Sequence, residues 1–114
     1  MENVENKMLD TVVNALQDKL AKDIVSLKVG DATPITDYFV IATATNTSQM
    51  DAMIDGVEEA MKDAGFDMKT REGRSQGGWV LLDYYDIVVH LFLTEMRDFY
   101  NLDGTWRDVP KQSY

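Results

Sequence analysis

The chain has 114 residues, of which 45% are hydrophobic and 27% are charged, and its formal net charge at pH 7 is −9. This size and composition indicate one soluble globular domain, and no apolar run reaches the roughly 20 residues that a membrane-spanning helix requires. The absence of cysteine excludes disulfides and thiol chemistry. The negative charge argues against a protein that wraps nucleic acid and favours a basic partner. The alternative is that the charge only keeps the protein soluble. The acidic, polar N-terminus resembles no targeting signal, so we expect a cytoplasmic protein.

The first half of the chain predicts a helix followed by two strands. Residues 2–21 place apolar side chains along one stripe at helical spacing. Residues 24–29 alternate between apolar and polar side chains, as a half-buried strand does. Residues 38–44 are apolar at nearly every position. A run of that kind is typical of a central strand that is covered on both faces.

The second half predicts another helix, three strands and a short final helix. Thr47 or Ser48 caps the second helix, and Gly65 stops it. The elements that follow are strands over residues 66–71, 79–83 and 86–93, a helix over 94–101 capped by Thr94, and an irregular tail over 108–114. The order α-β-β-α-β-β-β-α indicates an α/β fold of the α+β type, with a mixed five-stranded sheet flanked by helices in a single domain over residues 1–107.

The segment GGWVLLDYYDIVVHLF, residues 77–92, predicts a hairpin whose loop is Tyr84 and Tyr85. In this register Asp83 lies opposite Asp86, and like charges in that position are destabilising. Solvent, a bound proton, a metal ion or cations from a partner would each relieve the repulsion. Tyr-Tyr is an unusual two-residue turn, since glycine-containing pairs suit that geometry better.

Side chains along this hairpin alternate between the two faces of the sheet. One face is wholly aliphatic, includes Leu82, and is predicted to be core. The other face combines large apolar groups with ionisable ones and is predicted to be only partly covered. Its members are Trp79, Leu81, Asp83, Asp86, Val88, His90 and Phe92.

No catalytic or metal-binding motif stands out in the sequence. His90 is the only histidine, no nucleophile-elbow motif accompanies it, and no loop has the acidic spacing of an EF-hand. The run REGRSQGG, residues 71–78, contains glycines and basic residues but lacks the GK[ST] of a phosphate-binding loop. We therefore expect neither a cofactor nor a metal ion.

Three runs occur in a specific order and at a specific spacing. They are ITDYFVIATA (residues 35–44), GWVLLDYYDIVVHLF (78–92) and RDFYNLDGTW (97–106). Together they resemble the ribosomal silencing factor family, also called RsfS or Iojap, from the first helix to Trp106. Two sites depart from the family pattern: Tyr85 replaces the usual glycine of the turn, and Gly104-Thr105 replaces charged or bulky residues. A wider turn would leave Tyr85 as an exposed ring.

The resemblance implies a non-catalytic regulator whose fold is similar to that of nucleotidyltransferases. Members bind the large ribosomal subunit through its ribosomal protein fourteen, block joining of the small subunit and repress translation when nutrients are scarce. Neither membrane contact nor more than incidental contact with ribosomal RNA is implied. The alternative is a reduced nucleotidyltransferase that holds Mg²⁺ with Asp83 and Asp86. It is disfavoured because these carboxylates are not closely paired in sequence, and because TATNTS stands where those enzymes have a Gly-Ser turn.

Carried over position by position, the resemblance implies a partner-binding surface on the strand pair and the helix after it. The implied contact residues are Trp79, Leu82, Asp83, Tyr84, His90, Arg97 and Tyr100. Asp86 joins them because its carboxylate, like that of Asp83, can pair with Lys or Arg of a basic partner. For Leu82, the implied contact with a partner conflicts with its predicted burial on the aliphatic face. An apolar and aromatic face on a small domain is also a candidate surface for a homodimer.

Overall fold

One mixed β-sheet organises the chain, and the computed structural model describes residues 4–114. Its elements are α1 (Val4–Asp18), β1 (Lys22–Lys28), β2 (Tyr38–Ala44), α2 (Thr47–Asp63), β3 (Thr70–Arg74), the 3-10 turn η1 (Ser75–Gly77), β4 (Trp79–Asp83), β5 (Ile87–Leu93), α3 (Thr94–Tyr100), α4 (Leu102–Thr105) and β6 (Lys111–Ser113). The strand order is β3-β4-β5-β2-β1-β6. β2 and β5 are parallel, and the other neighbours are antiparallel. The predicted mixed sheet is confirmed, but it has six strands rather than five.

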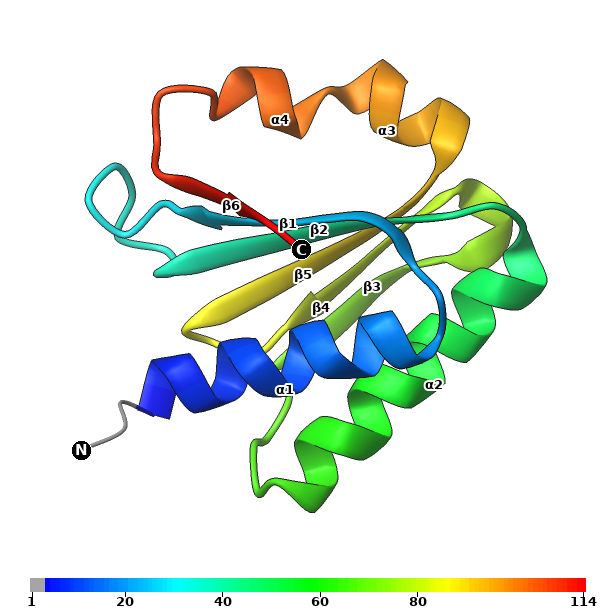
Figure 1. Cartoon of the computed structure of the whole chain (residues 1–114), viewed down its shortest axis with the longest axis horizontal. Helices are drawn as coiled ribbons and strands as arrows, with labels where there is room; N and C mark the ends of the chain where they lie inside the picture. Colours follow the sequence, from blue (N-terminus) through cyan, green and yellow to red (C-terminus); the bar gives the residue numbers. More distant parts are fainter. Residues whose placement is uncertain (1–3) are drawn as a thin grey trace.

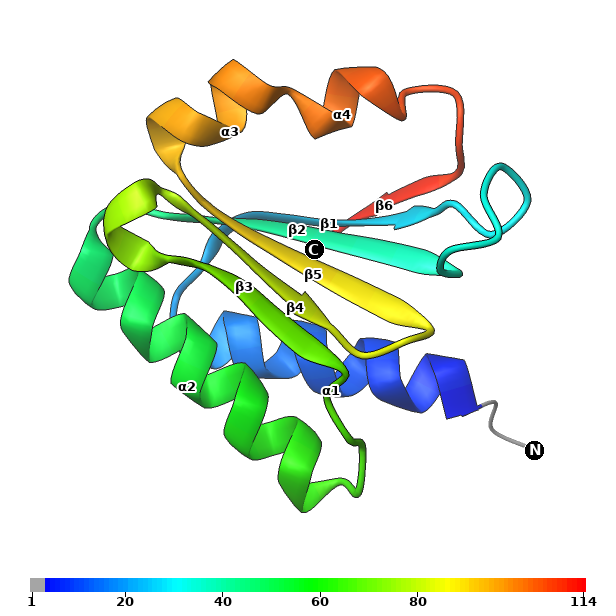
Figure 2. The ribbon, with the colours of Figure 1, turned by 180° about the vertical axis from the view of Figure 1, so that it is seen from behind.

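Helices cover the two faces of the sheet unequally (Figure 1). α1 and α2 lie on one face and enclose the larger apolar core with side chains of β2, β4 and β5. α3 and α4 form an arch over the other face and cover a smaller cluster made of Val25, Leu27, Val29, Ile41 and Phe92. The view from behind shows the same arch between the end of β5 and β6 (Figure 2). Because the arch is short, half-buried side chains remain along β4 on this face.

The ends of the long helices differ in detail from the predictions. The cap of α2 is Asn46, whose side-chain oxygen accepts a hydrogen bond from the backbone N–H of Gln49 at 2.7 Å, so Thr47 and Ser48 are helical residues instead. Gly65 follows α2 with φ +86°, which confirms it as the stop. α1 ends at Asp18, earlier than predicted, and residues 2 and 3 lie outside the described range. No helix within residues 4–114 is long and apolar enough to cross a membrane.

The central strands agree best with the sequence. β2 has the predicted bounds and lies between β1 and β5, with buried side chains contributing to the clusters on both faces. β1 begins before the predicted Ile24, because a bulge with Asp23 at φ +50° lengthens it. β3 begins at Thr70 rather than at Phe66, and all its residues are exposed. An edge strand without a buried face lacks the apolar periodicity that would locate it.

The register of the β4–β5 hairpin differs from the prediction by two residues. Asp83 pairs with Val88 and Trp79 with Phe92, so Asp83 does not face Asp86. The Tyr84 N–H donates to the Ile87 carbonyl at 2.9 Å, so these two residues are paired and the loop is Tyr85 and Asp86 rather than the predicted Tyr84 and Tyr85. Because side chains alternate with a period of two, this shift leaves both predicted faces unchanged. The repulsion expected from an opposed carboxylate pair is therefore absent at this position.

The C-terminal tail is ordered, which corrects the prediction of an irregular segment over residues 108–114. Residues 111–113 form β6, which pairs antiparallel with β1 and covers its outer edge. The Tyr114 N–H donates to the Ile24 carbonyl at 3.0 Å, and the Tyr114 hydroxyl lies 3.0 Å from the Ser26 hydroxyl. A three-residue strand has too weak a pattern to be recognised without its partner.

Candidate partner-binding face

An apolar patch lies where β4 meets α3. We call it the Trp79 patch, and it consists of Trp79, Leu81, Met96, Phe99 and Tyr100. The ring centroids of Trp79 and Tyr100 are 4.4 Å apart, and those of Tyr100 and Phe99 are 5.2 Å apart. Phe99 is 77% exposed and Tyr100 is 42% exposed, while Trp79, Leu81 and Met96 are half-buried. Clustered aromatic side chains with this exposure are typical of protein–protein contact sites.

A shallow hollow of about 150 Å³ lies beside the Trp79 ring, so the patch is concave at this edge. It is lined by Glu72, Gly73, Trp79 and Leu81. Gly73 has φ +87°, and a Cβ at this position would collide with the backbone carbonyl of Trp79, so glycine lets β3 lie against β4 here. The charged side chains of edge strand β3 oppose pairing with a further strand. The hollow therefore suits a partner's side chain better than a partner's backbone.

Four of the predicted contact residues reach the surface on or beside this face: Trp79, Asp83, Asp86 and Tyr100. Trp79 and Asp83 are half-buried on the same side of β4, and Asp86 is exposed in the turn that follows. One oxygen of the Asp83 carboxylate accepts a hydrogen bond from the Tyr85 N–H at 2.8 Å, so this side chain also stabilises the turn. Tyr85 lies in this loop with φ +70° and is 57% exposed, so its ring is on the surface as expected.

Three predicted contact residues are buried in the free protein, so their contact with a partner stays a prediction. Leu82 is fully buried and Tyr84 is 2% exposed, and both belong to the core beneath α1 and α2. Burial, aided by the charge of Glu58, raises the pKa of Tyr84 to about 12. His90 is 5% exposed and lies on the opposite side of the sheet, under the arch. In the free protein, solvent reaches none of these three side chains appreciably.

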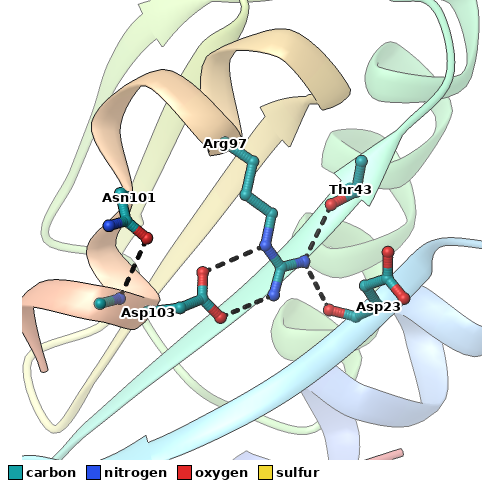
Figure 3. Close-up of polar contacts among 6 residues, drawn as sticks. Asp23, Thr43, Arg97, Asn101 and Asp103 are labelled. Atoms are coloured by element: carbon teal, nitrogen blue, oxygen red, sulfur yellow. Dashed lines mark hydrogen bonds and ion pairs between the residues drawn. The ribbon is translucent and has the colours of Figure 1, made fainter. Parts of the chain in front are cut away.

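Arg97, also predicted to contact a partner, points inward and holds the arch to the sheet (Figure 3). Its Nε and Nη2 donate to the two carboxylate oxygens of Asp103 at 3.2 and 2.9 Å. Its Nη1 donates to the Thr43 hydroxyl at 2.8 Å and to the Asp23 carbonyl at 2.6 Å. The side chain is 13% exposed. One guanidinium thus connects α3 with α4, β2 and the start of β1.

The junction between α3 and α4 supports this arrangement. Asn101 has φ +50°, which ends α3, and its side-chain oxygen accepts a hydrogen bond from the Gly104 N–H at 3.2 Å, which begins α4. The break in the helix turns Asp103 back toward Arg97 (Figure 3). Burial alone would raise the pKa of Asp103, but the hydrogen bonds and positive charge of Arg97 lower it below its ordinary value.

His90 lies under the Trp79 patch, on the same face of the sheet, and contacts Trp79. Its Nδ1 accepts a hydrogen bond from the Trp79 indole Nε1–H at 3.2 Å. Its ring also meets that of Phe39 edge-on, with centroids 4.8 Å apart. Burial lowers the pKa of His90 to about 4, so the ring is neutral at pH 7. The histidine is therefore a hydrogen-bond acceptor for Trp79 rather than a surface cation.

Sequence reasoning missed two parts of this face. Met96 and Phe99 belong to the patch, and the available signal was the helical spacing that places Phe99 and Tyr100 three and four residues after Met96. Asp103 was missed as the partner of Arg97, because six residues and a helix break separate them.

Within residues 4–114, no group of three or more His, Asp or Glu side chains is placed to hold a metal ion.

Comparison with known proteins agrees with the resemblance drawn from the sequence. Residues 2–114 match the family model described as "Ribosomal silencing factor during starvation". A protein of Halalkalibacterium halodurans named ribosomal silencing factor RsfS is 36% identical over 110 residues, which is 96% of this chain and 92% of that protein. A Mus musculus protein named mitochondrial assembly of ribosomal large subunit protein 1 is 31% identical over 105 residues, covering 86% of this chain and 44% of that protein.

A solved structure extends the agreement to three dimensions. The crystal structure of a protein from Chromobacterium violaceum has a TM-score of 0.87 and 33% sequence identity to this chain, and the match covers 94% of this chain and 88% of that one. The likeness therefore includes the sheet, the helices on both faces and nearly the whole sequence. This chain belongs to the ribosomal silencing factor family.

Proposed function

We propose that this protein binds the large ribosomal subunit through its ribosomal protein fourteen and blocks joining of the small subunit. Translation would thereby be repressed when nutrients are scarce, in the cytoplasm and without catalysis. The observation that carries the proposal is membership of a family whose model is described by ribosomal silencing during starvation and matches residues 2–114.

The chemistry of the Trp79 patch supports such a partner. Aromatic side chains form its centre, where contact energy between proteins concentrates. Asp83 and Asp86 lie at the turn end of the same strand pair, and the whole chain carries a formal net charge of −9. Ribosomal proteins are generally basic, so the two surfaces would have complementary charge. Complementary charge accelerates association and excludes partners of the wrong sign.

Mixing purified subunits tests this proposal directly. Large subunits are incubated with the protein before small subunits are added, and the products are separated on a density gradient. We expect less of the joined ribosome and co-sedimentation of the protein with large subunits alone. An unchanged joined peak, at a protein concentration in excess over subunits, would refute the blocking function.

Large-subunit assembly is a second candidate function. It is favoured by the similarity to the Mus musculus protein, whose name refers to assembly of the mitochondrial large subunit, although this chain spans 44% of that protein. The two candidates differ in what depletion of the protein does in cells. Loss of an assembly factor leaves immature large subunits, whereas loss of a blocking factor leaves mature subunits that join more readily.

The alternative of a reduced nucleotidyltransferase has little support in the site geometry. Asp83 pairs with Val88 across the ladder, and one of its carboxylate oxygens is engaged by the Tyr85 N–H. Asp83 and Asp86 therefore do not form the opposed pair that the predicted hairpin register placed here. Calorimetry with nucleotide and Mg²⁺ tests this alternative, and binding abolished by Asp83→Asn would revive it.

A further inference from the structure

His90 is a buried polar residue among aromatic rings. It is 5% exposed, and its ring lies near those of Phe39, Trp79 and Phe92. Nδ1 accepts the hydrogen bond from Trp79, while Nε2 is buried and has no hydrogen-bond partner within residues 4–114. A buried polar atom without a partner lowers stability and calls for an explanation.

The hydrogen bond determines the tautomer of the ring. Because Nδ1 accepts from the indole, it carries the lone pair, and Nε2 carries the hydrogen. A phenyl or aliphatic side chain at this position would avoid the unpartnered Nε2–H. What such a side chain would lack is the acceptor for Trp79, which is the one polar contact that His90 makes within residues 4–114.

The stacking contacts of Trp79 do not by themselves select one orientation of its ring. Trp79 stacks on Phe92 with centroids 5.2 Å apart and planes 23° apart, and it packs against Tyr100 on the exposed side. A stack is nearly as well satisfied when the indole is flipped within its plane. The N–H is the directional group of the ring, and only one flip points it at His90 Nδ1.

We propose that His90 is a positioning residue for docking, which holds the Trp79 indole in one orientation and never touches the partner. The inference rests on the proposed function, because the partner is the large ribosomal subunit. An indole held in its bound orientation loses less freedom on docking than one that flips. Ordering one such side chain corresponds to an affinity change of about threefold to tenfold.

Two substitutions of similar shape separate the acceptor from the packing. His90→Asn places a side-chain oxygen near the position of Nδ1, whereas His90→Leu has nearly the same volume and no acceptor. Both are made with Trp106→Phe, so that Trp79 supplies the only indole signal. The indole N–H resonance and its exchange with solvent report the hydrogen bond, and co-sedimentation with isolated large subunits reports docking.

We expect His90→Leu to shift the Trp79 resonance, to accelerate its exchange and to weaken docking about threefold to tenfold, with His90→Asn close to the unaltered protein. Unchanged docking by folded His90→Leu would overturn the positioning role alone. Failure of the unaltered protein to bind large subunits would overturn the proposed function and this inference with it. If both variants unfold, the unaltered protein decides: an indole N–H of Trp79 that exchanges as fast as a free indole would overturn the inference.

Discussion

At the residue scale, neighbouring side chains of the same type have different roles in this protein. Asp83 and Asp86 are both predicted contacts, but Asp83 also stabilises the turn through the Tyr85 N–H, and Asp86 is exposed. Leu82 and Tyr84 alternate with Leu81 and Asp83 along one chain, yet they belong to the core. Alternation along a strand therefore separates surface from support at each position.

The exposed acidic residue gives the first prediction. Asp86→Lys should weaken binding to large subunits by about threefold to tenfold at low salt and less at high salt, because a rim charge acts mainly through long-range attraction. Asp51→Lys is the matched control, since Asp51 is exposed on α2, which covers the opposite face of the sheet. Co-sedimentation at two ionic strengths measures both variants. Equal losses for Asp51→Lys and Asp86→Lys would show that net charge alone matters.

The second prediction concerns the pH dependence of stability. The pKa of His90 is about 4 in the folded protein and 6.5 when exposed, so between these values the unfolded chain binds the proton and the folded chain does not. Stability from this group is complete above pH 6.5 and is lost progressively as the pH falls toward 4, to a total of about 3 kcal/mol. Denaturant unfolding at pH 7 and pH 5 measures the loss. His90→Leu should show a smaller decrease, and an identical decrease would contradict the assignment.

At the element scale, the arch of α3 and α4 depends on one ion pair more than on its own helical propensity. α3 has seven residues and α4 has four, which is too short for either to be stable alone. Two kinds of contact supply the stabilisation that the helices lack: the apolar packing of the arch on the cluster beneath it, and the hydrogen bonds of Arg97 to Asp103, Thr43 and the Asp23 carbonyl. Since α3 carries Met96, Phe99 and Tyr100, this connection also places three of the five residues of the Trp79 patch.

The third prediction tests that connection. Arg97→Met should destabilise the fold by about 2 kcal/mol, because it leaves the Asp103 carboxylate partly buried without its partner. The matched control is Arg71→Met, whose ion pair with Glu58 has side chains 50% and 30% exposed, compared with 13% and 26% for Arg97 and Asp103. The control should lose less than about 0.5 kcal/mol. Denaturant unfolding of both variants measures the difference, and equal losses would refute the role of Arg97.

Elements were predictable from the sequence where burial imposed a period. β2 and β4 have the predicted bounds, since each has side chains that a core selects. β3 and β6 were misplaced or missed, because their residues are exposed and their backbones are ordered by β4 and β1. The hairpin register was wrong by two residues, because a shift of two keeps every side chain on its face and the pattern cannot detect it.

At the scale of the whole molecule, the protein leaves an aromatic surface uncovered. Phe99 is 77% exposed beside Tyr100 and the half-buried Trp79, and nothing within residues 4–114 covers it. Such a surface suits docking to a larger partner, and in the free protein it suits contact with a second copy. A dimer formed there would have to dissociate before docking.

The fourth prediction follows from this surface. The free protein should self-associate with rising concentration, and Phe99→Ser should shift it toward the monomer and weaken binding to large subunits. Leu20→Ser is the matched control, because Leu20 is 78% exposed but lies outside the Trp79 patch. Sedimentation velocity over a concentration series measures the equilibrium. A monomer at all concentrations would contradict self-association. The docking proposal would then be tested only by the effect of Phe99→Ser on binding to large subunits.

The sequence by itself determined the order of the main elements, the aliphatic face of the hairpin and the family, because apolar periodicity and ordered motifs are local properties of the chain. Only the tertiary structure decided which members of the candidate site are exposed. Arg97, Tyr84 and His90 look like surface candidates in the sequence, and each is withdrawn from solvent by segments distant in sequence. Burial depends on what folds over a residue, and no local pattern contains that information.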